Sequence, residues 1–131
     1  MNRVKTDSGI LIVLAFGIMI IGSMLLAGCQ TAPVLGAPVD SARLTDGTYE
    51  GSYRGGPNRA VVKVTIKDHA IADIEIVEHQ AWKGHKAETP VVERIIANQS
   101  TRVDAVSGAT NSSNVIMDAV QNAIEKAYRN E

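Results

Sequence analysis

Side chains along residues 61–67 follow a strict period of two, and residues 70–78 repeat the alternation, with Ile74 and Ile76 opposite Asp73 and Glu75. The apolar positions that share one face are Val62, Val64, Ile66, Ile74 and Ile76. A period of two is typical of strands that bury one face and expose the other. Between the two segments, Asp68 and His69 tolerate positive φ better than most residues and predict a tight turn. The chain is therefore expected to contain an antiparallel hairpin with one face in water.

A third strand is expected over residues 48–53, after the turn signal Asp46-Gly47. This strand is expected to end at residues 55–58, Gly-Gly-Pro-Asn, which are typical of a turn. A further short strand is predicted within residues 99–106.

Two segments carry the period of a helix. The first is expected to begin near Thr89-Pro90, a capping residue followed by proline, and to end near Asn98. Its apolar stripe is Val92, Ile95 and Ile96. The second follows residues 111–114, Asn-Ser-Ser-Asn, which all suit an N-cap.

The stripe of the second helix is Ile116, Ala119, Val120, Ala123, Ile124 and Ala127. This spacing is that of a regularly buried helix face, and its alanines allow close packing on a sheet. We predict an α+β domain, with a small antiparallel or mixed sheet and two helices packed on it.

The N-terminal part of the chain has a different character. Arg3 and Lys5 precede an apolar run from Gly9 to Gly28, which is typical of a signal peptide. Twenty residues also suffice to span a bilayer core of about 30 Å, so an uncleaved anchor remains the alternative. In both cases the basic end stays inside the cell, and the rest of the chain is expected to face outward.

The apolar run ends in Leu26-Ala27-Gly28-Cys29, which resembles the lipobox of bacterial lipoproteins. The resemblance implies a signal peptide over residues 1–28, cleavage before Cys29 and a lipid on its sulfur. Residues 29–45, with Pro33, Gly36 and Pro38, then predict a tether. The domain proper is expected over residues 46–131, in the bacterial cell envelope.

Composition excludes several classes of site. A formal net charge of -1 argues against nucleic-acid binding, which needs a basic face. A single cysteine excludes a disulfide framework and any multi-cysteine metal site within this chain. His79 and His85 are six residues apart, a spacing that matches neither a helical pair nor a metal motif, so no metal site is expected.

Residues 104–113, Asp-Ala-Val-Ser-Gly-Ala-Thr-Asn-Ser-Ser, form a small-residue loop that runs into the last predicted helix. A helix N-terminus offers free backbone N–H groups and the positive end of its dipole, which suit a phosphate. The residues alone leave an ordinary capped helix as the alternative.

This loop and the alanine-rich helix after it resemble the signature of FMN-binding domains. Such domains occur in the sodium-pumping NADH:quinone reductase and in the related electron-transport complex. The resemblance covers about residues 46–128, because the first strand, the hairpin and the last helix fall in the family's order. It implies that Thr110 carries FMN as a phosphoester, attached by a separate FAD:protein FMN transferase. The remaining residues of the implied cofactor site are Asp104, Ser107, Gly108, Ala109, Ser112 and Ser113.

The resemblance implies a lipid-anchored electron carrier rather than a catalyst, and no catalytic residues are expected. A membrane reductase or a quinone-linked donor is the implied partner. The alternatives are a structural or ligand-binding lipoprotein without flavin, and a sensor that binds FMN or a small ligand non-covalently. Two roles are open for Trp82: it either stacks on the flavin or is an ordinary surface residue. Lys83, Lys86 and Arg94 either face the flavin phosphate or form a solvated face.

Overall fold

The computed structural model describes residues 36–128. Its elements are β1 (Gly47–Gly55), β2 (Asn58–Lys67), β3 (Ala70–Gln80), the 3₁₀ turn η2 (His85–Ala87), α2 (Glu88–Asn98) and α3 (Thr110–Ala127). The strands form one antiparallel sheet in the order β1-β2-β3. The predicted α+β fold, with a small sheet and two helices, is confirmed. None of the helices within residues 36–128 has the length and apolar character needed to cross a membrane.

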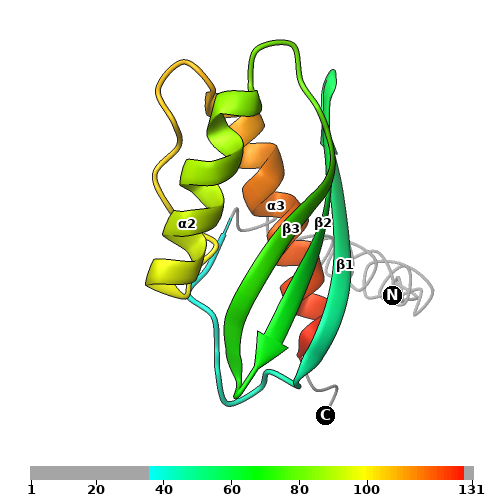
Figure 1. The fold of residues 1–131 in the computed structure, drawn as a ribbon, viewed down its shortest axis with the longest axis vertical. Coiled ribbons are helices and arrows are strands. Elements are labelled where there is room, and N and C mark those ends of the chain that lie inside the picture. The colour runs from blue at the N-terminus through cyan, green and yellow to red at the C-terminus, as the bar shows by residue number, and fades with distance from the viewer. Residues whose placement is uncertain (1–35, 129–131) are drawn as a thin grey trace, which may run out of the picture. The chain divides into compact units, whose positions relative to one another are not determined.

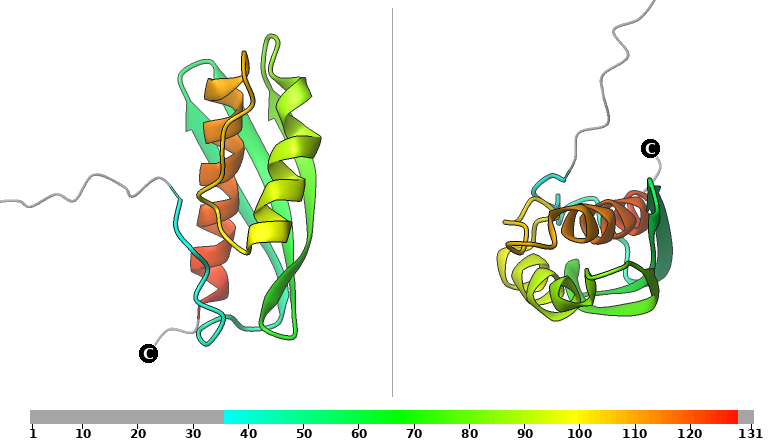
Figure 2. Two further views of the ribbon diagram at one scale, coloured as in Figure 1. Left: turned by 90° about the vertical axis from the view of Figure 1, so that its left-hand side faces the viewer. Right: turned by 90° about the horizontal axis from the view of Figure 1, so that it is seen from above.

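Both helices cover the same face of the sheet (Figure 1; Figure 2). Helix α3 packs across β1 and β2, and α2 lies beside β3. The two helices begin at the same end of the sheet, and residues 99–109 run back from the end of α2 to the start of α3 (Figure 1). The predicted short strand within residues 99–106 is wrong, because among the described residues this segment makes only an isolated bridge between Ser100 and Pro38.

The β2–β3 turn forms as the sequence predicted. Asp68 and His69 adopt φ values of 53° and 58°, the left-handed conformation that a two-residue hairpin turn requires. Asp46 holds this turn in place, because its carboxylate accepts hydrogen bonds from the backbone N–H groups of His69 and Asp68 at 2.9 and 3.0 Å. These two hydrogen bonds, His69 first, lower the pKa of Asp46 below its ordinary value.

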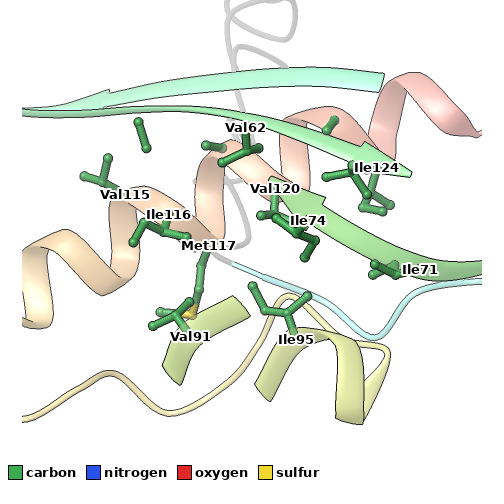
Figure 3. Close-up of a cluster of buried hydrophobic side chains, with 14 of the residues drawn as sticks. Val62, Ile71, Ile74, Val91, Ile95, Val115, Ile116, Met117, Val120 and Ile124 are labelled. Carbon is green, nitrogen blue, oxygen red and sulfur yellow. The ribbon is translucent and has the colours of Figure 1, made fainter. Parts of the chain in front are cut away.

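The core lies between α3 and the sheet (Figure 3). The predicted helix stripe is confirmed in full, since every one of its six residues is at most 1% exposed. The opposing sheet face includes the predicted residues Val62, Val64, Ile66 and Ile74, with Ile76 partly buried. In α2 the most buried pair is Val91 and Ile95, which lie one turn apart, whereas Val92 and Ile96 are only partly buried. The predicted apolar stripe of this helix included Val92, but the residue that is fully buried in the structure is Val91.

The last ten residues of the predicted tether pack on the domain. Leu44 is fully buried in the core and bridges Tyr128. The N–H of Val39 donates to the carbonyl of Gln99 at 3.0 Å, and the N–H of Thr101 donates to the carbonyl of Ala37 at the same distance. Residues 36–45 therefore belong to the packed unit, not to a free tether. The predicted signal peptide, Cys29 and the rest of the tether lie outside the described residues.

Asp118 is the buried carboxylate of α3, with 8% of its surface exposed. Burial raises its pKa from 3.8 to about 6. The folded state therefore holds this proton more tightly than the unfolded state, and the free energy of unfolding falls as pH rises from about 4 to about 6.

We expect Asp118→Asn to stabilise the domain at pH 7 by about 1–3 kcal/mol, because the amide cannot ionise. The advantage should shrink as pH falls through 4 and below, where the unfolded state of the wild type also becomes protonated. Urea denaturation across this pH range measures it, with the exposed Asp73→Asn as control. Equal stability of Asp118→Asn and wild type at pH 7 would contradict the prediction.

Candidate functional site

A cleft of about 250 Å³ opens at the end of the sheet where both helices begin. Three segments form it: the start of β2, the connection between β3 and η2, and the loop that enters α3. Its lining residues are Asn58, Trp82, Lys83, Gly84, Gly108, Ala109, Thr110, Asn111 and Ser112. The cleft therefore gathers residues that are up to 54 positions apart in the sequence, at the N-terminus of α3.

Helix α3 begins at Thr110 without a side-chain cap. The predicted N-cap at residues 111–114 is wrong, because these residues form the first turn of the helix itself. The hydroxyl of Ser113 instead donates to the carbonyl of Ala109 at 2.8 Å and accepts from the N–H of Val106 at 2.9 Å. It fixes the entering loop against the helix. The first backbone N–H groups of α3 have no partner within the helix and no side-chain cap. They lie next to the exposed side chain of Thr110.

The loop turns sharply just before the helix. The N–H of Ala109 donates to the carbonyl of Val106 at 2.9 Å, which closes a turn around Ser107 and Gly108. Gly108 has φ +74°, as the third residue of a type II turn requires. The Nζ of Lys86 lies so near that a Cβ on Gly108 would approach it to 2.8 Å. A cation from η2 therefore stands beside the turn that leads to Thr110.

Gly84 sets how closely the β3–η2 connection approaches α3. A Cβ at this position would overlap the side chain of Ser112, so only glycine allows this contact. The neighbouring Lys83 lines the same cleft, and the ring of Trp82 is 92% exposed at it. The close contact at Gly84 thus brings a second cation and an uncovered indole to the start of α3.

The structure separates the predicted site residues into two groups. Gly108, Ala109, Thr110 and Ser112 line the cleft, and Ser107 is exposed in the adjoining turn. Ser113 is fully buried and bonded to the backbone, and neither it nor Asp104 lines the cleft. Asp104 is exposed, and its carbonyl accepts a hydrogen bond from the guanidinium of Arg94 at 2.6 Å. Arg94 therefore holds the loop, whereas Lys83 lines the cleft and Lys86 lies beside the adjoining turn at Gly108.

His79 and His85 both reach Glu88, the first residue of α2. Their Nδ1 atoms lie 2.8 and 2.7 Å from the same carboxylate oxygen, Oε1. Partial burial acts to raise the pKa of Glu88, but the hydrogen bonds from the two histidines outweigh it and the pKa lies below its ordinary value. Sequence reasoning missed this cluster, because the spacing of the histidines alone does not reveal the third member.

An uncapped helix start, a glycine turn, two lysines and an exposed hydroxyl together suit a phosphate group. The sequence profile of the FMN-binding domain matches residues 55–125, which include the whole cleft-forming region. The chain belongs to the FMN-binding domain family.

Three relatives are similar to this FMN-binding domain. An uncharacterized protein of Treponema pallidum (strain Nichols) is 33% identical over 91 residues, which is 65% of this chain and 24% of the relative. The NADH:acrylate oxidoreductase of Vibrio harveyi is 30% identical over 90 residues, 67% of this chain and 9% of the relative. The NADH:fumarate oxidoreductase of Klebsiella pneumoniae (strain 342) is 30% identical over 90 residues, 67% of this chain and 10% of the relative. The chain thus spans a quarter or less of the length of each.

Proposed function

We propose that this domain carries FMN as a phosphoester on Thr110 and relays electrons in the bacterial cell envelope. The observation that carries the proposal is the exposed Thr110 side chain at the uncapped start of α3, inside the cleft. A phosphodiester on this oxygen keeps one negative charge. The helix N-terminus favours such a charge by about 0.3–1 kcal/mol.

The residues around Thr110 fit the phosphate end of FMN. Lys83 lines the cleft and Lys86 lies beside the turn at Gly108, so both supply positive charge near the start of the helix. The small residues Gly108 and Ala109 leave room next to the attachment oxygen. Trp82 offers an uncovered aromatic face on which the isoalloxazine ring can stack.

Attachment requires a separate enzyme, because a threonine hydroxyl is too weak an acid to attack a pyrophosphate unaided. In the reaction we propose, the oxygen of Thr110 bonds to the FMN phosphorus of FAD. The pyrophosphate bond breaks, AMP leaves, and the hydroxyl proton passes to the transferase. FAD:protein FMN transferase is therefore a proposed partner.

Bound FMN supplies reversible electron transfer, and the domain supplies its position and electrostatics. Two relatives are named as NADH-dependent oxidoreductases, and this chain corresponds to about a tenth of each. We therefore propose only the carrier step for this chain. Its electron donor is proposed to be a membrane reductase or a quinone-linked donor, with the chain anchored through a lipid on Cys29.

Intact mass of the full chain, expressed in a bacterium with and without the transferase, tests the proposal. We expect the transferase to add the mass of one FMN minus water. The same spectrum tests the lipid anchor. A lipoprotein should lose the mass of residues 1–28 and gain that of a diacylglyceryl group. A folded chain that gains no mass beside an active transferase would instead favour a domain that binds its ligand non-covalently.

A further inference from the structure

We propose that His79, His85 and Glu88 form a binding site for a divalent transition-metal ion such as Zn²⁺. The three residues come from three successive elements: the end of β3, η2 and the first turn of α2. Their ligand atoms all lie within 4.8 Å of one another. Imidazole nitrogen and carboxylate oxygen are both ordinary zinc ligands. Two histidines and a glutamate form a ligand set that leaves the fourth coordination position open to water.

The observed distances are close to those of a loaded site. Tetrahedral zinc holds nitrogen and oxygen ligands at about 2.0–2.1 Å, which places neighbouring ligand atoms about 3.3 Å apart. The Nδ1 atoms of His79 and His85 now lie 2.8 and 2.7 Å from Oε1 of Glu88. Each has to move away from this oxygen by about 0.6 Å, and the two Nδ1 atoms, which lie within 4.8 Å of each other, have to take up the same spacing.

The exposure of the three side chains fits a site that an ion can enter. The side chain of His79 is 1% exposed, and its Nε2 is buried without a hydrogen-bond partner in the described part of the chain. Burial restricts the movement of this ring, whose Nδ1 lies against Glu88. His85 is 63% exposed and can adjust, and Glu88 is 32% exposed. One rigid ligand and two accessible ligands leave a path for the ion from water.

This site adjoins the cleft without sharing its lining. His85 directly follows Gly84, and Trp82 precedes it by three residues. An ion bound by all three ligands would tie the end of β3 to the start of α2 and restrain the connection between them. Because Trp82 is the only tryptophan of the chain, its fluorescence reports on this connection.

The experiment uses the full chain without transferase, stripped of metal and carrying Cys29→Ser, because a thiolate is itself a zinc ligand. Calorimetric titration with Zn²⁺ is expected to show one ion per chain. Trp82 fluorescence should change and saturate at the same ratio. Co²⁺ should produce the visible absorption of a four-coordinate site with nitrogen and oxygen ligands.

Variants decide whether these residues are the ligands. His85→Ala and Glu88→Gln should weaken Zn²⁺ binding by more than the roughly 10–100-fold that loss of an outer partner of a metal site costs. His69→Asn is the matched control, since His69 lies in the turn before β3, at the opposite end of that strand from His79, and contacts the carbonyl of Leu44. The Zn²⁺ affinity of this variant should equal that of the parent. Circular dichroism and melting in EDTA establish that each variant folds.

Either of two results would overturn the proposal. One is a parent chain that binds no Zn²⁺ at one ion per chain. The other is unchanged affinity in folded His85→Ala and Glu88→Gln. Neither result depends on flavin, so the proposed FMN site is tested separately.

Discussion

Thr110→Ala is expected to abolish the covalent gain of FMN completely while leaving the domain folded. The threonine side chain is exposed and makes no hydrogen bond in the described structure, so its removal costs α3 little stability. The methyl group of alanine has no oxygen to bond to phosphorus, so no phosphoester can form. Intact mass after co-expression with the transferase measures the loss, and circular dichroism establishes that the variant folds.

Three variants separate the attachment oxygen from its neighbours. Thr110→Ser keeps a hydroxyl and should keep the mass gain in part or in full. Ser107→Ala and Ser112→Ala remove the two other hydroxyls at or beside the cleft and should still gain one FMN. A flavin mass on Thr110→Ala, or its loss in Ser107→Ala or Ser112→Ala alone, would place the attachment on a different residue.

Periodic patterns in the sequence were sufficient for the core of the fold. The alternation at residues 61–78 predicted the hairpin, because a period of two leaves only one way to bury Val62 and Val64 together. The α3 stripe was equally predictable, since Ile116, Val120 and Ile124 recur one turn apart. The Asp68–His69 turn followed from local conformational preference. All three depend on neighbours in the sequence alone.

The features that the sequence did not predict depend on distant contacts. Residues 36–45 lack periodicity, and they pack because Thr101 and Tyr128 meet them across the fold. Helix α3 begins at Thr110, earlier than the sequence predicted, because Ser113 forms hydrogen bonds with Val106 and Ala109 instead of capping the helix. Local capping preference alone could not distinguish these two uses of a serine.

The candidate site shows the same division. The loop of residues 104–113 was visible from its small residues, and the resemblance assigned Thr110 within it. The approach of Lys86 to Gly108 and of Gly84 to Ser112 could not be predicted from the sequence. These contacts come from η2 and the connection before it, and each joins residues more than twenty positions apart in the sequence. Glu88 joined the two histidines for a similar reason: the connection after β3 folds back before α2 begins.

Gly51→Ala is expected to destabilise the domain by about 3 kcal/mol or more, the upper end of what overpacking a core costs. Gly51 lies in β1 beneath α3. An added Cβ would overlap the carbonyl oxygen of Ala119 and approach the backbone nitrogen of Ala123 to 2.6 Å. Because both obstacles are backbone atoms, no change of rotamer can relieve them, and α3 has to move away from the sheet.

Thermal denaturation is the measurement, and a loss of 3 kcal/mol in a domain of this size lowers Tm by about 12 °C or more. Gly56→Ala is the matched control, since a Cβ there meets nothing within 4 Å and bears only the strain of φ +62°, about 1–2 kcal/mol. A larger loss in Gly51→Ala than in Gly56→Ala separates the packing of α3 from turn strain. Equal losses would mean that α3 does not rely on its close approach to β1. Because α3 also carries Thr110, its displacement should reduce flavin attachment in whatever fraction of Gly51→Ala still folds.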